Sequence, residues 1–141
     1  MNERYTTKLA VENYIQQQLD PAFTNQLTAY IDAMSEHCDE LAGFPIYRTE
    51  ATTRLYDGCG LSIQSIDPVH TITEVKVNDI VVTPLQVPYN SDVKTQLRLN
   101  GDVFNESLAN VSVTGIHAIK KTLPAPVAHA CTVFVARGHY H

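Results

Sequence analysis

The longest helical pattern of apolar and polar positions in the chain runs from Asp20 to Gly43. Apolar side chains recur there at steps of three and four, which places them on one stripe of a helix. They are Phe23, Leu27, Tyr30, Ile31, Met34, Cys38 and Leu41. Asp20 suits an N-cap before Pro21, and Gly43 suits the left-handed residue that ends a helix. The pattern predicts a packed helix over residues 21–42, with polar residues such as Asp39 on its opposite face.

Two further segments have a helical pattern. Residues 7–19 follow a possible cap at Thr6 or Thr7, and their apolar side consists of Leu9, Val11, Tyr14, Ile15 and Leu19. Residues 125–137 begin between two prolines and end before Gly138. Their apolar stripe consists of Val127, Ala130, Cys131, Phe134 and Val135. The sequence therefore predicts three helices, each with an apolar side that needs covering.

Between the second and third helices, apolar and polar residues alternate in short runs that are typical of strands. Residues 53–57 and 61–66 predict a hairpin around Asp57-Gly58-Cys59-Gly60, which Asp67-Pro68 would end. Residues 72–77 and 80–83 predict a second hairpin around Asn78-Asp79. Residues 96–99 and 110–115 suggest a further pair, while residues 85–95 have the composition of a loop. We expect five or six short antiparallel strands within residues 50–116.

The order of these elements predicts the fold class. A lone helix cannot bury its stripe, so the third helix is expected to return to the first two. The prediction is an α+β protein, a small three-helix bundle with an antiparallel β-sheet insertion between the second and third helices. At 141 residues and 44% hydrophobic composition, the chain is expected to form a single domain over residues 1–141.

Composition and charge exclude several classes of protein. No apolar run approaches the roughly 18 residues that span a bilayer, and the N-terminus lacks a signal-peptide core. We therefore expect a cytoplasmic product with no membrane contact. The three cysteines favour reduced thiols over a disulfide framework. A net charge of −5 disfavours a nucleic-acid binder driven by phosphate neutralisation.

The possible ligands of a metal ion lack the spacing that such a site needs. His129 and Cys131 are two residues apart, as are His139 and His141, and His37 adjoins Cys38. Residues two apart on a helix point about 200° away from each other. No Cys-x-x-Cys or His-x-x-x-His pattern is present. We expect no metal and no cofactor.

Cys59 is the one candidate nucleophile, because flanking glycines would expose it in a turn. Activation would need a nearby base, and His70 and His117 are the candidates. The simpler interpretation of Gly58-Cys59-Gly60 is a turn that needs positive φ at its glycines. Asp39, Glu40, Asp57, Asp67 and Asp102 lie at expected helix ends or turns, where carboxylates cap or are solvated. We therefore expect no enzyme activity, with a small enzyme built on Cys59 or a histidine site as an alternative.

Several phrases resemble the head-tail connector, or head completion adaptor, proteins of tailed bacteriophages. They are Gly43-Phe44, Thr53-Arg54-Leu55-Tyr56-Asp57-Gly58, Ile66-Asp67-Pro68-Val69, Ile72-Thr73-Glu74-Val75-Lys76-Val77, Asn110-Val111-Ser112-Val113-Thr114-Gly115 and the Pro-led helix from Pro124 to Ala136. Their order and spacing carry the resemblance more than any single phrase. The chain departs from the family in its short tail after the third helix and in its larger β insertion.

The resemblance implies a structural virion protein of the neck, between head and tail, that is made in the host cytoplasm. Such a protein docks on the portal protein as a ring of about twelve copies and extends the DNA channel. It offers a platform to a stopper or tail-completion protein. Double-stranded DNA would pass without sequence-specific binding, which suits an acidic protein. The alternative within the virion is a tail terminator or another neck component that binds tail proteins.

The resemblance also places two partner-binding segments. The portal-binding segment is expected to be the C-terminal end, with the preceding helix. It consists of Arg137, Gly138, His139, Tyr140 and His141. A contact with a neighbouring copy, the stopper or the channel lumen is expected in a long polar loop. That loop contains Val87, Pro88, Tyr89, Asn90, Ser91 and Asp92.

Overall fold

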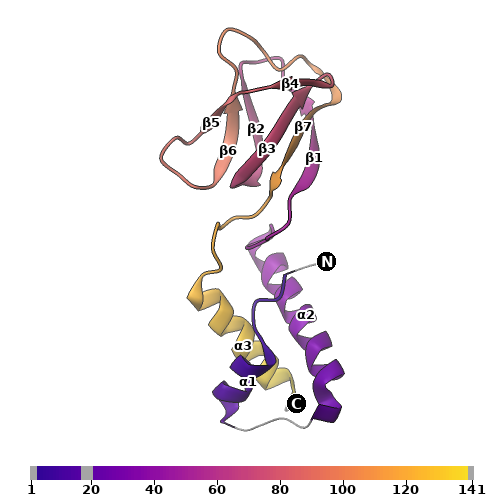
Figure 1. Cartoon of the computed structure of the whole chain (residues 1–141), viewed down its shortest axis with the longest axis vertical. Helices are drawn as coiled ribbons and strands as arrows, with labels where there is room; N and C mark the ends of the chain where they lie inside the picture. Colours follow the sequence, from indigo (N-terminus) through magenta and orange to yellow (C-terminus); the bar gives the residue numbers. More distant parts are fainter. Residues whose placement is uncertain (1–2, 17–20, 140–141) are drawn as a thin grey trace. The chain divides into compact units, whose positions relative to one another are not determined.

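The computed structural model describes residues 3–16 and 21–139, and in them it contains three α-helices and two antiparallel sheets (Figure 1). The predicted α+β class is therefore confirmed. The chain divides into two compact units. The helical unit comprises Met1–Tyr47 and Thr122–His141, and the β unit comprises Arg48–Lys121. No helix within the described residues is both long and apolar enough to cross a bilayer.

The first helix, α1, spans Lys8–Ile15 and begins at the predicted cap. The Ala10 N–H donates to Thr7 Oγ1 at 3.1 Å, which satisfies one of the free donors of the first turn. The helix is shorter than predicted because Gln16 adopts a left-handed conformation, with φ of 56°, and its N–H bonds back to Glu12. Leu19, which was expected near the helix end, lies outside the described residues.

The second helix, α2, spans Thr24–Ala42 and follows a short 3₁₀ helix, η1, over Pro21–Phe23. The prediction that Pro21 opens the α-helix is therefore wrong, and the predicted cap Asp20 lies outside the described residues. The other end is confirmed: Gly43 has a φ of 79°, and its N–H bonds to the Glu40 carbonyl. The third helix, α3, spans Ala125–His139.

The three helices share one apolar core, to which the segment before α1 and the segment after α2 also contribute. It consists of Tyr5, Val11, Leu27, Ile31, Cys38, Ile46, Cys131, Val135 and Ala136. Tyr5 is fixed from both ends, since its N–H donates to Ser35 Oγ at 2.9 Å and its hydroxyl donates to Asp39. Burying each large apolar side chain contributes roughly 1.5–3 kcal/mol, so this core orders the helical unit.

The predicted stripe of α2 is only partly buried. Leu27, Ile31 and Cys38 lie in the core, but Phe23, Tyr30 and Leu41 are exposed. Ser35 and Asp39 are buried instead. Asp39, which was expected on the polar face, accepts a hydrogen bond from the Ile46 N–H at 2.9 Å. The core therefore covers a narrower strip of α2 than its apolar pattern suggested, and it includes polar residues with partners.

The β unit contains seven strands among the described residues. They are β1 Thr52–Gly58, β2 Ile63–Val69, β3 Thr71–Val77, β4 Ile80–Val82, β5 Leu85–Val87, β6 Lys94–Arg98 and β7 Ser107–Ile116. One sheet has the order β1-β7-β3-β4 and the other has the order β2-β6-β5 (Figure 1). Both sheets contribute to a single core of Ile66, Val69, Val75, Val77, Leu97, Phe104, Val111 and Val113. The β unit is therefore a two-sheet sandwich rather than one sheet.

Two predictions of local pairing are corrected by this topology. The strands β1 and β2 do not form a hairpin, because β1 pairs with β7 and β2 pairs with β6. After the turn, Gly60 N–H donates to the Phe104 carbonyl and Phe104 N–H donates to the Leu61 carbonyl, which carries the chain into the other sheet. The suggested pairing of residues 96–99 with 110–115 is wrong for the same reason, since β6 and β7 lie in different sheets.

The remaining strand predictions differ less from the structure. Pro68 does not end its strand, and lies within β2, which is an edge strand where a missing N–H is tolerated. Residues 85–87, expected in a loop, form β5 and pair with β6. The hairpin of β3 and β4 is confirmed, and Asn78 and Asp79 both have positive φ at its turn.

Candidate functional site

The structure does not assemble the cysteine site that the sequence left open. Cys59 is exposed, and its thiol lies 3.1 Å from the Ile63 carbonyl oxygen. His70 Nδ1 contacts the Thr71 hydroxyl at 2.9 Å, while His117 Nε2 contacts the Val113 carbonyl at 3.2 Å. Neither imidazole therefore serves as a hydrogen-bonded base for the thiol. Within residues 3–16 and 21–139, no group of three or more His, Cys, Asp or Glu residues is arranged to hold a metal ion.

Two other cysteines, far apart in sequence, meet in the helical core. Cys38 of α2 and Cys131 of α3 are both buried, and their thiols interact with each other. Burial raises the pKa of both thiols, that of Cys131 to about 11. The Ser35 hydroxyl lies 3.7 Å from the Cys131 sulfur. These thiols stay protonated at neutral pH and act as packing groups, a contact that no sequence spacing indicated.

Three of the carboxylates singled out in the sequence accept hydrogen bonds within the β unit. Asp57 accepts the Ala109 N–H at 2.7 Å, and Asp102 accepts the Val103 N–H at 2.8 Å. Asp67 of β2 accepts from Arg54 and from the Tyr56 hydroxyl of β1, each at 3.1 Å. This last cluster ties one sheet to the other. These contacts agree with structural roles for the carboxylates.

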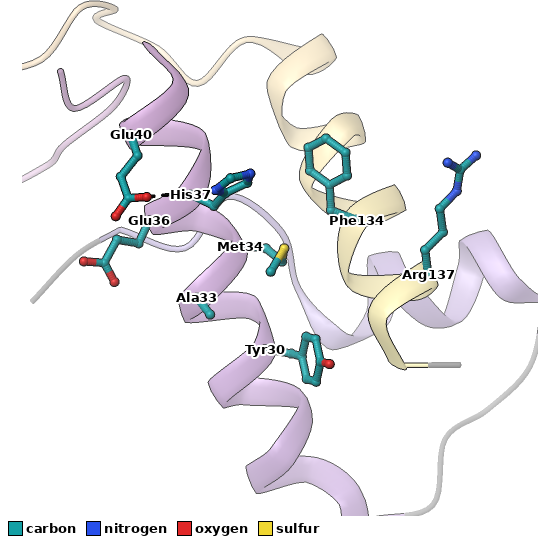
Figure 2. A pocket seen from close by; sticks show the side chains of 8 residues that line it. All are labelled: Tyr30, Ala33, Met34, Glu36, His37, Glu40, Phe134 and Arg137. Carbon is teal, nitrogen blue, oxygen red and sulfur yellow. Dashed lines mark ion pairs between the residues drawn. The ribbon is translucent and has the colours of Figure 1, made fainter. Parts of the chain in front are cut away.

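The described part of the helical unit has a surface hollow between α2 and α3, which we call the α2–α3 hollow. It has a volume of about 550 Å³. Tyr30, Ala33, Met34, Glu36, His37 and Glu40 of α2 line it, together with Phe134 and Arg137 of α3. Figure 2 shows the side chains of Tyr30, Met34 and His37 directed toward the space between the two helices. The hollow was missed because the sequence pattern assigned Tyr30 and Phe134, which are partly exposed, to the core.

The walls of the hollow combine an apolar floor with charged margins. The rings of His37 and Phe134 approach edge to face, with centroids 6.5 Å apart and planes at 70°. His37 Nδ1 lies 3.9 Å from Glu40 Oε2 (Figure 2). Tyr30 and Phe134 keep 40% and 39% of their surface exposed. Aromatic rings that remain partly exposed around a hollow are a common feature of protein contact surfaces.

The structure places the predicted C-terminal segment only in part. Arg137 lies at the exposed edge of the α2–α3 hollow. Gly138 and His139 continue α3, whereas Tyr140 and His141 lie outside the described residues. The structure therefore connects Arg137, but not the whole segment, with the hollow.

The predicted loop lies in the β unit. Residues 88–93 connect β5 to β6, after Val87 has paired with Gln96. Lys94 Nζ donates to the Pro88 carbonyl at 2.7 Å, and Ser91 N–H donates to the same oxygen at 3.4 Å. Tyr89 keeps 61% of its surface exposed, and Asn90 and Asp92 are also exposed. The loop thus has a fixed base and presents an aromatic ring to the solvent.

A second surface hollow lies on the β unit and has a volume of about 320 Å³. It lies between β1, β7 and the turn of β3 and β4, and its lining includes Leu55, Asn78, Asp79 and Leu108. Leu55 and Leu108 are 62% and 83% exposed. This hollow had no counterpart among the sequence predictions.

Comparison with known proteins gives matches in structure but not in sequence. No protein-family model and no curated protein matches the chain. A chain from the solved neck of an empty GTA particle, computed with C6 symmetry, is similar at a TM-score of 0.66 and 13% identity. A chain from the neck of a native GTA particle, computed with C12 symmetry, is similar at a TM-score of 0.57 and 15% identity. Each match covers 100% of this chain and 84% of the other. At these identities the likeness establishes a shared fold.

Proposed function

We propose that this protein is a structural component of the neck of a phage-like particle, acting as a head-tail connector adaptor. The observation that carries the proposal is the fold similarity, which spans the whole chain, to chains of GTA necks. The sequence phrases that resemble phage connector proteins support it independently. The other support is the pattern of surfaces described above, in which partly exposed apolar side chains line two hollows. Among the described residues, neither candidate imidazole is hydrogen-bonded to the Cys59 thiol.

The adaptor would work as a ring. The similar chains come from assemblies with C6 and C12 symmetry. In a ring, each copy contacts its neighbours through two different patches, and a closed rotation limits the assembly to a fixed number of copies. We propose a ring of about twelve copies that docks on the portal protein, with one contact patch on the helical unit and another on the β unit. A net charge of −5 would keep such a ring from retaining passing double-stranded DNA.

The proposal is tested by joining heads to tails in vitro. Deleting the gene should leave filled heads and free tails in the lysate, and adding the purified protein should restore joined particles, counted by electron microscopy. Heads that are preincubated with the protein and then freed of unbound protein should join to added tails. Preincubation with tails alone would instead identify a tail terminator. Joined particles in the deletion lysate without added protein would refute a role in the neck.

A second experiment tests the portal-binding segment. A chain that ends at residue 136 lacks Arg137 to His141, and it should lose binding to isolated portal rings in a sedimentation assay. The deletion removes only the last turn of α3 and the end of the chain, so the helical core residues remain. Unchanged binding to the portal rings would reject this assignment while leaving the joining test unaffected.

A further inference from the structure

We infer that the α2–α3 hollow is a docking groove for one amphipathic helix of a different protein, with Lys or Arg residues on the flank of that helix that meets α2. The inference concerns a surface and a partner chemistry that the proposed adaptor function does not specify. It stands on the spacing of the exposed apolar residues, on the charges beside them and on the composition of this chain's own helices.

The helix α2 has two apolar faces. The first packs into the core through Leu27, Ile31 and Cys38. The second consists of Tyr30, Met34, His37 and Leu41, which recur at steps of four, three and four. Leu41 is 70% exposed and Tyr30 is 40% exposed. Such spacing aligns side chains along one helical stripe and is the spacing by which helices anchor in grooves.

The second wall of the groove comes from α3. Phe134 is 39% exposed, and Figure 2 shows its ring across the hollow from Tyr30 and Met34. Two helices therefore offer a continuous apolar floor. The described residues of the chain leave this floor partly exposed. A helix laid along the floor would bury the exposed parts of these rings, and burial of aromatic surface is a main source of binding energy at protein interfaces.

The charges select the chemistry of the partner. Within its bounds α2 carries four carboxylates and no Lys or Arg. Asp32 is paired with Arg4 at 2.6 Å, and Asp39 is buried against Tyr5. Glu36 and Glu40 remain at the α2 margin of the hollow, on the side of the helix directed away from α3 (Figure 2). A partner flank that carries Lys or Arg would complement this margin, and Arg137 would favour an acidic or polar residue on the other flank.

The same composition disfavours a second copy of this chain as the occupant. The basic residues of its helices are Lys8 in α1 and Arg137 in α3, and α2 has none. No described helix of the chain therefore has a basic flank. The groove fits a helix from another protein.

The test uses designed helical peptides and the full-length protein. One fluorescent 18-residue peptide carries Leu at helical steps of three and four with Lys on one flank, and a matched peptide carries Glu there instead. Fluorescence anisotropy should show binding of the Lys peptide, weakening as salt is raised. The Glu36→Lys/Glu40→Lys variant should bind the Lys peptide roughly tenfold more weakly and prefer the Glu peptide. Glu50→Lys/Glu106→Lys, which reverses two exposed carboxylates outside the hollow, should behave as wild type.

The apolar floor needs a separate variant. Phe134→Ala should weaken both peptides, and circular dichroism should show unchanged helix content because the ring is partly exposed. Binding of neither peptide at about 1 mM, or an unchanged preference after charge reversal, would overturn the inference. A concentration-dependent homodimer that Met34→Lys abolishes would overturn it too, because a second copy would then occupy the groove. None of these outcomes depends on whether the protein joins heads to tails.

Discussion

At the scale of single residues, we expect the buried histidine His117 to make the β unit less stable in acid. It is 3% exposed, and within the described residues its Nδ1 atom has no hydrogen-bond partner. Burial lowers its pKa below the ordinary value of 6.5, against the bond to the Val113 carbonyl, which raises it. The nearby Arg54 lowers this pKa further and Asp67 raises it. The folded state therefore holds His117 neutral.

The sign of the pH effect follows from this lowered pKa. Below about pH 6.5 the unfolded chain binds a proton at this position that the folded chain resists, so stability is lost as the pH falls toward the folded pKa. We expect the thermal midpoint of the β unit to fall between pH 7.5 and 5.5, and His117→Gln to reduce this fall. His37→Gln changes an exposed histidine and should keep the wild-type slope. An equal slope in His117→Gln and wild type would contradict the prediction.

Gly115 tests how closely the strands of the sandwich approach each other. A Cβ atom at this position of β7 would lie 2.5 Å from the Thr71 carbonyl oxygen and 2.9 Å from Val69 Cγ2. We expect Gly115→Ala to destabilise the protein by roughly 3 kcal/mol, because backbone and packed side chains must shift. Gly101→Ala is the matched control. Gly101 has a φ of 78° and open space around it, so the substitution should lower the free energy of unfolding by about 1–2 kcal/mol. If urea unfolding gave the same loss in free energy of unfolding for both variants, the close contact at Gly115 would be readily relieved.

At the scale of elements, the turn of β3 and β4 is not at its optimum. Both Asn78 and Asp79 have positive φ, of 52° and 65°, as a type I′ turn requires. Asp79→Gly creates the Asn-Gly pair that this turn prefers and relieves the left-handed conformation of Asp79. The substitution should stabilise the protein by about 0.5–1 kcal/mol, measured as a raised urea midpoint with an unchanged slope. Asp79→Ala keeps the strain, and a stabilisation of similar size in that variant would point to loss of charge instead.

The elements also show which parts of the fold the sequence could predict. The hairpin of β3 and β4 was predicted because a two-residue turn fixes its pairing locally. The partners of β1 and β2 were not, because alternation identifies a strand without identifying its neighbour. Their partners β7 and β6 lie far along the chain, and Gly60 directs the chain to the second sheet. Sequence distance, more than strand propensity, limited the prediction.

The candidate site was missed for a related reason. Periodicity showed that Tyr30, Met34 and Leu41 share a side of α2, but not how wide a strip the core would cover. The core instead takes Ser35 and Asp39, whose polar groups bind Tyr5. Such pairs form only when distant segments meet, so the sequence pattern counted apolar residues of the groove as core. One signal of the groove was available in the sequence. The apolar stripe of α2 is wider than one neighbouring helix can cover.

At the scale of the whole molecule, two separate cores support surfaces with different chemistry. The helical unit offers an aromatic groove with charged margins, and the β unit offers a loop and a hollow between exposed leucines. The neck component that we propose would have to hold at least two kinds of neighbour at once. Separate cores allow substitutions on one unit to leave the packing of the other unchanged, so the partner of each surface can be tested singly.

The loop of residues 88–93 gives the last such test. Its base is held by Lys94, whose ammonium group binds the Pro88 and Tyr89 carbonyls, so the Tyr89 ring can change without loosening the loop. We expect Tyr89→Ser to leave the thermal midpoint within about 1 °C, because surface substitutions cost little, but to lower head-tail joining roughly tenfold, since exposed aromatic residues dominate many interfaces. Leu61→Ser is the matched control, because it removes an exposed apolar side chain on the same unit outside both the loop and the hollow. Equal joining by Tyr89→Ser and wild type would remove this loop from the contact surface and favour the hollow beside Leu108 as the contact of the β unit.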